Sequence, residues 1–336
     1  MVTSPVGDLK VSDCLRIAFF GTPQFAVPTL RKLLASRHQV CGVVTQPDRP
    51  RGRGRHVSDS PVKALALECG LRLLQPERLR EPSFAETLRE WEPDLGVVAA
   101  YGKLIPEEIL SLPRLGMINV HASLLPKYRG AAPVQRAVID GESQTGVTIM
   151  RLEKMLDAGA MLAKAVRPIG PNDTSDVVER DLALMGTDLL LEVVKQIAAG
   201  TEQEEPQDFM VCSYAPRLTK EEGLVDWSLP AQVVHNRVRG LYPWPHAYTY
   251  LGPLRLILLK TRVESATAHA APGTIVDASS DAIHVATGHG ERIAIEQLQP
   301  GGRRLMSARE FLAGHRVKPG VRFTGPLSPI AGVAGP

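Results

Sequence analysis

The stretch LRIAFFGTPQFAVPTLRKLLASRHQVCGVVTQ, residues 15–46, decides the fold. It opens with a short apolar run, 15–21, and ends with a second one, 40–46. Between these runs, residues 30–38 carry apolar side chains at helical spacing. A buried strand, a helix and another buried strand, joined by short links, predict a parallel strand–helix–strand unit.

The same alternation continues downstream. Ser60 and Pro61 are residue types typical of an N-cap and a first helical position, and Gly70 is typical of a helix stop. A long helix is predicted over 175–198, ended by Gly200. Further strands are predicted over 71–75, 94–102, 116–122, 146–153 and 160–169. The sequence therefore predicts a doubly wound, mostly parallel, Rossmann-like sheet of the α/β class.

Composition changes after this sheet. Residues 201–215 begin polar and acidic and have no apolar period, so they predict a linker. Short apolar runs split by Gly, Pro, Asp and Ser follow over 216–330 and predict a small C-terminal β-barrel. With 336 residues, two domains are expected. The expected organisation is a leader over 1–14, an α/β domain over 15–200, the linker and the barrel.

Charge and composition bound the function classes. The net charge of +3 is too small to name a partner, and 44% hydrophobic residues allow both domains a core. Residues 217–336 hold 14 basic and 9 acidic residues, which permits contact with phosphates. No apolar run reaches the length of a membrane span, about 18 residues, and no signal peptide is visible. A cytoplasmic protein is expected.

Cysteine and histidine spacing argues against metal sites. The four cysteines, Cys14, Cys41, Cys69 and Cys212, include no C-x-x-C pair, so neither a zinc knuckle nor a disulfide framework is predicted. The nine histidines form no cluster with ligand spacing. The sequence predicts no bound metal and a reducing compartment.

Two polar residues lie near the end of the apolar strand 116–122. Asn119 and His121 stand at i and i+2, so their side chains share one face of the strand. An amide can donate to an oxyanion, and an imidazole can accept a proton near neutral pH. Asp157, in a Leu-Asp-x-Gly turn of the same sheet, would fix the tautomer of His121. The trio suits acyl transfer. A structurally hydrogen-bonded histidine and a simple turn at Asp157 are the alternatives.

A loop rich in arginine follows the second strand. QPDRPRGRGRH, residues 46–56, contains Arg49, Arg51, Arg53 and Arg55 against one carboxylate, Asp48. Its prolines and glycines predict neither strand nor helix. The loop is either a solvated charged face or an arm that binds a phosphate backbone.

Two other stretches allow a structural and a functional interpretation. FFGTPQFA, residues 19–26, lies where a dinucleotide-binding loop would lie, but only Gly21 of the three required glycines is present. A dinucleotide oxidoreductase is therefore disfavoured. LYPWPHAYT, residues 241–249, is either a rigid connection between domains or a wall of a ligand or nucleic-acid groove.

Taken together, these stretches resemble the methionyl-tRNA formyltransferase family over residues 15 to 315. HASLLP, RGAAP and LDAGAML indicate the wider family of enzymes that use 10-formyltetrahydrofolate. VVTQPDRPRGRGR and YPWP narrow the resemblance to the enzymes that act on tRNA. Other matching stretches are FGTPQFAVPTL, SPVKALA, VVAAYGKLIP, VQRAVIDGESQTGVTIM and APGTI.

The resemblance assigns roles to individual residues. It implies that Asn119, His121 and Asp157 are catalytic. It further implies an arginine loop that enters the tRNA acceptor end, with Arg53 as the closest match, and a C-terminal barrel of the oligonucleotide-binding (OB) type that contacts tRNA. The segment implied to bind tetrahydrofolate is Ser123, Leu124, Leu125 and Pro126.

The implied reaction moves a formyl group from 10-formyltetrahydrofolate to the α-amine of methionine on initiator tRNA, without a metal. The enzyme is expected to be a monomer. One alternative is a formyltransferase acting on a small amine, such as glycinamide ribonucleotide or an amino sugar, which would not need the arginine loop. The other is a non-catalytic RNA-binding protein that uses the C-terminal domain.

Overall fold

The structure is a computed structural model that describes residues 14–51, 56–279 and 281–325. The chain divides into two compact units. The first comprises the residues up to Pro133, Thr145–Pro168 and Glu179–Ala215. The second comprises Val134–Gln144, Ile169–Val178 and the residues from Pro216 onward. Of the predicted leader over 1–14, only Cys14 lies within the described residues.

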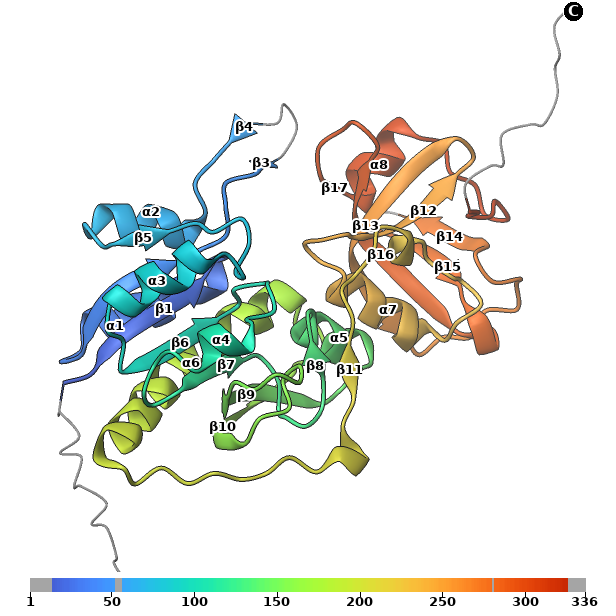
Figure 1. Cartoon of the computed structure of the whole chain (residues 1–336). Coiled ribbons are helices and arrows are strands. Elements are labelled where there is room, and N and C mark those ends of the chain that lie inside the picture. Colours follow the sequence, from blue (N-terminus) through green and yellow to red (C-terminus); the bar gives the residue numbers. More distant parts are fainter. Residues whose placement is uncertain (1–13, 52–55, 280, 326–336) are drawn as a thin grey trace, which may run out of the picture. The chain divides into compact units, whose positions relative to one another are not determined.

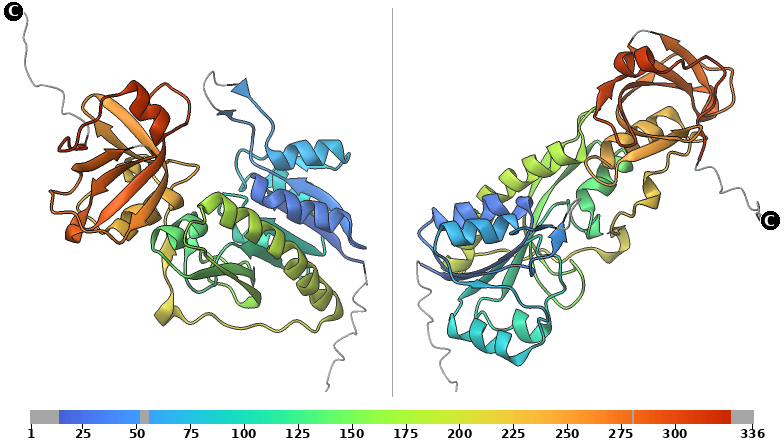
Figure 2. Two further views of the ribbon diagram at one scale, coloured as in Figure 1. Left: turned by 180° about the vertical axis from the view of Figure 1, so that it is seen from behind. Right: turned by 90° about the horizontal axis from the view of Figure 1, so that it is seen from above.

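The first unit contains a seven-stranded sheet with helices on both faces (Figures 1 and 2). Strand β1 pairs in parallel with β2 and β6, and β6 pairs in parallel with β7, whereas β9 runs antiparallel to β7. The mostly parallel, Rossmann-like sheet is thereby confirmed. In spatial order the strands are β10 (Met161–Pro168), β9 (Gln144–Arg151), β7 (Met117–His121), β6 (Leu95–Ala99), β1 (Arg16–Gly21), β2 (Gln39–Val44) and β5 (Leu73–Leu74).

The strand order reverses at β1. The chain builds β2 and β5 on one side of β1, then returns to build β6 and β7 on the other. In an open parallel sheet the loops then diverge at the carboxyl ends, and ligands bind in the crevice between them. The carboxyl end of β7, one strand beyond β6, therefore lies beside the expected binding crevice.

Helices cover the two faces of this sheet. One face packs on a buried cluster that includes Phe20, Phe84, Leu88 and Met117 and lies against α3 and α4. Over the opposite face, a Cβ at Gly186 of α6 would meet Val120 of β7. The helices associated with this sheet are α1 (Val27–Leu34), α2 (Pro61–Glu68), α3 (Pro82–Glu90), α4 (Glu107–Leu110) and α6 (Ser175–Ala199).

Local sequence explains where several helices begin. Ser60 caps α2 by accepting a hydrogen bond from the amide of Lys63 (3.1 Å), as predicted. Helix α1 starts before the predicted range, because Pro28 occupies a first-turn position where a missing N–H costs nothing. Helix α6 agrees with the predicted range. Among the described helices, none combines the length and apolar character needed to cross a membrane.

The prediction that residues 46–56 contain no strand was wrong. Pro50–Arg51 (β3) pairs antiparallel with His56–Val57 (β4), although prolines and glycines predicted no strand here. A two-residue ladder has free edges, and proline is compatible with an edge strand. Arg53 and Arg55 lie outside the described residues, and Arg49 is exposed.

The second unit is an antiparallel sheet with three short helices. A small β-barrel was predicted, whereas the described residues form an antiparallel sheet in which no closed barrel is found. The edge strands β12 and β14 are not paired with each other, and only single bridges tie Tyr250 to Thr324 and Thr274 to Arg322. Its elements are α5 (Pro133–Ile139), α7 (Ala231–Gly240), β12 (Ala247–Leu251), β13 (Leu254–Glu264), β14 (Ile275–Ser279), β15 (Ala282–Ala286), β16 (Arg292–Pro300), β17 (Met306–Ser307) and α8 (Ala308–Gly314).

Candidate active site

Strand β7 presents Asn119 and His121 on one face. Side chains alternate along a strand, so both share the face of Met117, which packs with the α3 and α4 cluster. Asn119 is 9% exposed and His121 is 5% exposed. Two polar side chains near the carboxyl end of a buried strand need partners or a ligand.

Asn119 has an unused amide. No hydrogen bond joins its side chain to another described residue, although the residue is only 9% exposed. Its amide is not among the fully buried polar atoms that lack a partner, so it reaches accessible space. Native proteins rarely leave a buried amide without a partner unless a ligand or water supplies one. The amide is therefore available to donate to a bound oxygen atom.

His121 is oriented by two groups. Its Nε2 donates to the carbonyl of Tyr128 over 3.0 Å, because a carbonyl oxygen can only accept. In the neutral ring Nδ1 is then the unprotonated nitrogen. Nδ1 lies 3.7 Å from Oδ2 of Asp157, too far for a hydrogen bond but close enough for an ion pair when the ring is protonated.

Asp157 is held in a fixed turn. Its Oδ2 accepts a 2.8 Å hydrogen bond from the amide of Gly130, and its backbone has a φ of 47°. A side chain at Gly159 would place its Cβ 2.1 Å from the carbonyl oxygen of Arg151, so only glycine allows this turn. The structure thus brings Asp157 to His121 and places Asn119 on the same strand face.

The predicted tetrahydrofolate segment forms a tight turn after β7. Thr148 Oγ1 donates to the carbonyl of Ser123 (2.7 Å) and accepts from the amide of Leu125 (3.2 Å). Ser123 and Leu125 are buried, whereas Leu124 and Pro126 keep part of their surface exposed. Only the latter two offer side-chain surface, and the role of the segment stays a prediction.

Gln207 is a residue that the sequence did not reveal. Its Oε1 accepts from Nε and Nη2 of Arg129 (3.0 and 2.8 Å). Its Nε2 donates to the carbonyls of Asp157 (2.9 Å) and Gly159 (2.8 Å). Arg129 is fully buried and also stacks on the ring of Phe209, 4.6 Å from its centroid. Gln207, itself held by Arg129, thus fixes the turn around Asp157 by binding two of the backbone carbonyls of that turn.

The predicted linker supports the same region. Arg129–Gly130 (β8) pairs in parallel with Tyr214–Ala215 (β11). The amide of Tyr128 also donates to Oγ of Ser213 (2.9 Å). The backbone that binds both His121 and Asp157 is therefore fastened by residues 213–215. No apolar period could indicate these contacts, because they join segments about eighty residues apart by hydrogen bonds.

We expect Gln207→Leu to lower kcat for the reaction at this site about tenfold or more, with KM nearly unchanged. The loss of four hydrogen bonds to a buried group should also lower the free energy of unfolding by about 1–3 kcal/mol. Steady-state kinetics and thermal unfolding measure the two effects.

Gln207→Glu is the matched control for this prediction. It keeps the acceptor for Arg129 but loses the N–H groups that hold the Asp157 turn. We expect it to recover stability without recovering kcat. A kcat that follows only the folded fraction in both variants would show that Gln207 is structural.

A search for metal sites among the described residues finds no group of three or more His, Cys, Asp or Glu side chains arranged to hold an ion.

Comparison with known proteins identifies relatives over nearly the full length. The model of the formyl transferase domain matches residues 15–194, and that of the formyl transferase C-terminal domain matches 217–316. Methionyl-tRNA formyltransferase of Geobacter metallireducens is 46% identical over 309 residues, covering 92% of this chain and 98% of the relative. That of Methylococcus capsulatus is 46% identical over 301 residues, covering 90% and 97%.

Solved structures with the same fold are more distant in sequence. WlaRD, a sugar 3N-formyl transferase determined with dTDP and 5-N-formyl-THF, has a TM-score of 0.65 at 16% identity, covering 86% of this chain and 99% of its own. HypX from Aquifex aeolicus in complex with tetrahydrofolic acid has a TM-score of 0.60 at 18% identity, covering 89% and 47%. These likenesses show the fold of the chain.

Proposed function

The chain belongs to the methionyl-tRNA formyltransferase family, and we propose that Asn119, His121 and Asp157 carry out its formyl transfer. The enzyme moves the formyl group of 10-formyltetrahydrofolate to the α-amine of methionine on initiator tRNA, giving the formylmethionyl-tRNA that starts translation. Relatives with this name over nearly the full chain favour it over the small-amine alternative. The single observation that carries the site is that Asn119, whose amide bonds no described residue, shares one face of β7 with His121, which faces Asp157.

The residues present fit a formyl donor. When bound, 10-formyltetrahydrofolate supplies the formyl carbon and a nitrogen that leaves. A formyl oxygen needs a donor, and the Asn119 amide makes no hydrogen bond to another described residue. Leu124 and Pro126 offer half-exposed apolar surface on the turn that follows β7. We assign the folate contact to this turn, residues 123–126.

Asn119 acts on the developing charge. The acceptor amine attacks the formyl carbon, and negative charge develops on the formyl oxygen. Asn119 donates a hydrogen bond to that oxygen, and such a donor contributes about 2.7–4 kcal/mol to lowering the barrier. The bond from carbon to the acceptor nitrogen forms first, and the bond to the folate nitrogen breaks when the electron pair on oxygen returns to the carbon.

His121 moves the proton. Nδ1 is the unprotonated nitrogen of the neutral ring, so it accepts the proton that the amine loses. The protonated ring then faces the Asp157 carboxylate at 3.7 Å, which stabilises the new positive charge. His121 returns the proton to the leaving nitrogen. Asp157 is thus a positioning and charge-stabilising residue, and Gln207 supports it through the backbone.

Single-turnover formyl transfer tests this site. The wild-type chain is incubated with 10-formyltetrahydrofolate and charged initiator tRNA, and formylmethionine is measured against variants of Asn119 and His121. Rates within a factor of about ten of wild type in both variants would contradict the assignment, because general acid–base and oxyanion effects are larger.

The arginine loop is proposed to contact tRNA. The loop whose sequence contains Arg49, Arg51, Arg53 and Arg55 begins after β2, at the carboxyl edge of the sheet where α/β proteins bind ligands. We expect Arg53→Leu to raise KM for tRNA, with a weaker dependence on salt, and to leave KM for the folate unchanged. Arg31→Leu, which removes an exposed arginine of α1, is the control. Equal changes in both KM values would show that the loop supports the fold instead.

The remaining assignments are part of the same proposal. Residues 15–200 would carry the chemistry and residues 216–330 would contact tRNA, the latter as a barrel of the OB type supported by the single bridges through 322–324. A cytoplasmic monomer fits an enzyme that acts on charged tRNA before translation. Analytical ultracentrifugation tests the monomeric state.

A further inference from the structure

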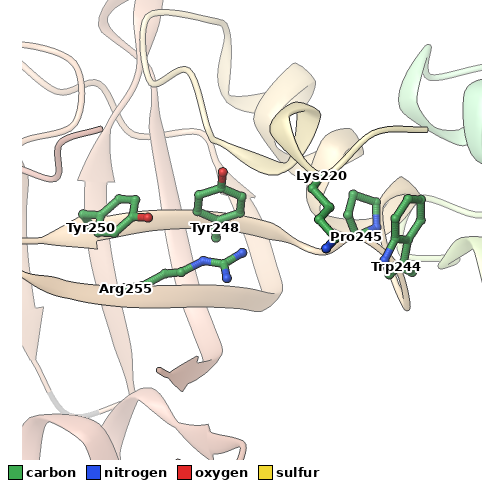
Figure 3. Close-up of a pocket in the computed structure, with 6 residues that line it drawn as sticks. All are labelled: Lys220, Trp244, Pro245, Tyr248, Tyr250 and Arg255. Atoms are coloured by element: carbon green, nitrogen blue, oxygen red, sulfur yellow. The ribbon is translucent and has the colours of Figure 1, made fainter. Parts of the chain in front are cut away.

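A pocket of about 370 Å³ lies in the second unit, whereas the residues of the proposed catalytic trio belong to the first (Figure 3). Its volume falls at the lower end of the range for small-molecule sites, about 300–1,000 Å³. Both strands β12 and β13 contribute to it. Its lining consists of Lys220, Trp244, Pro245, Tyr248, Tyr250 and Arg255.

Three of the six side chains that line this pocket are aromatic. Tyr248 and Tyr250 stand at i and i+2 of β12 and pack edge to face, with centroids 6.0 Å apart. The intervening Thr249 points the other way, fully buried, and accepts from Nε1 of Trp227 (3.0 Å). Trp244 is 49% exposed. The aromatic surface therefore faces out of the core.

Two cations complete the pocket. The guanidinium of Arg255 lies over the ring of Tyr248, 3.9 Å from its centroid, and Figure 3 shows Lys220 beside Pro245. None of the six lining residues is acidic. A stacked guanidinium keeps its outer face and N–H groups free for a flat ligand and an anion.

A glycine brings the lysine segment close. Lys220 precedes a short turn, Glu221–Gly223, and a Cβ at Gly223 would lie 2.4 Å from the carbonyl oxygen of His246 and 2.8 Å from the ring of Tyr248. The amide of Val225 then donates to the carbonyl of Tyr248 (2.9 Å). The turn is thus fixed on β12, so the pocket is built into the fold.

Planar rings, two cations and no carboxylate together match a flat anion. Proteins hold single-stranded nucleic acid by stacking bases on aromatic side chains and pairing phosphates with Lys and Arg. We propose that this pocket binds one unpaired nucleotide of the tRNA substrate. The base stacks on the aromatic surface, and Lys220 and Arg255 hold the adjoining phosphate. The proposal rests on the proposed function, because it presupposes a tRNA substrate.

Tryptophan fluorescence tests the pocket on the full chain. Of the three tryptophans, Trp91 and Trp227 are 4% and 6% exposed, so Trp244 is the accessible reporter. We expect a single-stranded oligoribonucleotide to quench its emission, and a blunt RNA duplex of equal length to leave the emission unchanged. Equal quenching by both would overturn the proposal, because a duplex offers no unpaired base to stack.

Variants separate stacking from charge. We expect Tyr250→Leu to weaken tRNA binding about tenfold with an unchanged salt dependence, and Tyr250→Phe to restore it. Arg255→Gln should reduce the slope of log affinity against log salt by about 0.7. The matched control is Arg309→Gln, which removes an exposed arginine of α8 paired with Asp281. Wild-type affinity and slope in both pocket variants would overturn the proposal.

An assay of formyl transfer distinguishes failure of the proposed function from failure of the proposed nucleotide pocket. If the wild-type chain does not formylate charged initiator tRNA, the proposed function fails. If it does, and Tyr250→Leu leaves KM for tRNA unchanged while thermal unfolding shows a folded protein, only the nucleotide pocket fails. Because Tyr250 lies in the second unit, KM for the folate and the rate of the chemical step should stay at wild-type values.

Discussion

Asn119→Ala is expected to lower the single-turnover rate of formyl transfer by about 10²–10³-fold, the cost of one lost oxyanion donor. Because the donor acts only as charge develops, KM for folate and tRNA should change little. The stability of the variant should equal or exceed that of wild type, since the amide has no hydrogen-bond partner among the described residues. Rapid-quench kinetics and thermal unfolding measure both.

Asn236→Ala provides the same substitution at a site without chemistry. Asn236 is also buried, but its Oδ1 accepts from Nε and Nη2 of Arg239 (3.0 and 2.9 Å). This variant should lose about 1–3 kcal/mol of stability and keep the rate of the chemical step. Should Asn119→Ala instead lose stability in proportion to activity, the oxyanion role would be wrong.

His121→Ala is expected to slow the chemical step by about 10²–10⁴-fold, the usual worth of a positioned acid–base group. The effect should depend on Asp157, because the carboxylate faces Nδ1 at 3.7 Å. Asp157→Asn keeps an oxygen that can accept from the Gly130 amide but removes the charge. Combining the two changes should cost little more than His121→Ala alone, since residues that act as a unit are not additive.

His235→Ala serves as the control for this second series. His235 is buried, contacts Oγ1 of Thr261 and the carbonyl of Pro171 at 2.9 Å each, and has a pKa lowered by burial. It should lower stability and leave formyl transfer by the folded enzyme intact. Multiplicative losses in the His121 and Asp157 double variant would contradict a functional pair.

The spacing of apolar residues was sufficient to predict most strands of the first unit. Short apolar runs predicted β1, β2, β6 and β7, because buried parallel strands are apolar on both faces. Helix α3 was not predicted, since PSFAETLRE is largely polar and only Phe84 and Leu88 are buried. A barrel was predicted for the second unit, but the described residues show no closed one, because local patterns cannot decide closure. It depends on pairing between edge strands far apart in the chain, and local patterns do not encode such pairing.

The residues of the candidate site that were predicted are those whose placement follows from the geometry of the strands. Asn119 and His121 share a face because side chains alternate, and Asp157 follows a strand of the same sheet. Gln207 could not be found in this way. It lies in a polar stretch without a period, and its importance comes from four hydrogen bonds to Arg129, Asp157 and Gly159.

The pairing of β8 with β11 constrains how such enzymes could exchange domains during evolution. Composition suggests a joint near Gly200, but recombination there would replace Gln207 and the strand that braces Gly130. A crossover after Ala215 would keep Gln207 and β11 with the residues that they support, and would exchange only the part of the second unit from Pro216 onward. Chimaeric descendants of this lineage should therefore carry their junctions beyond Ala215.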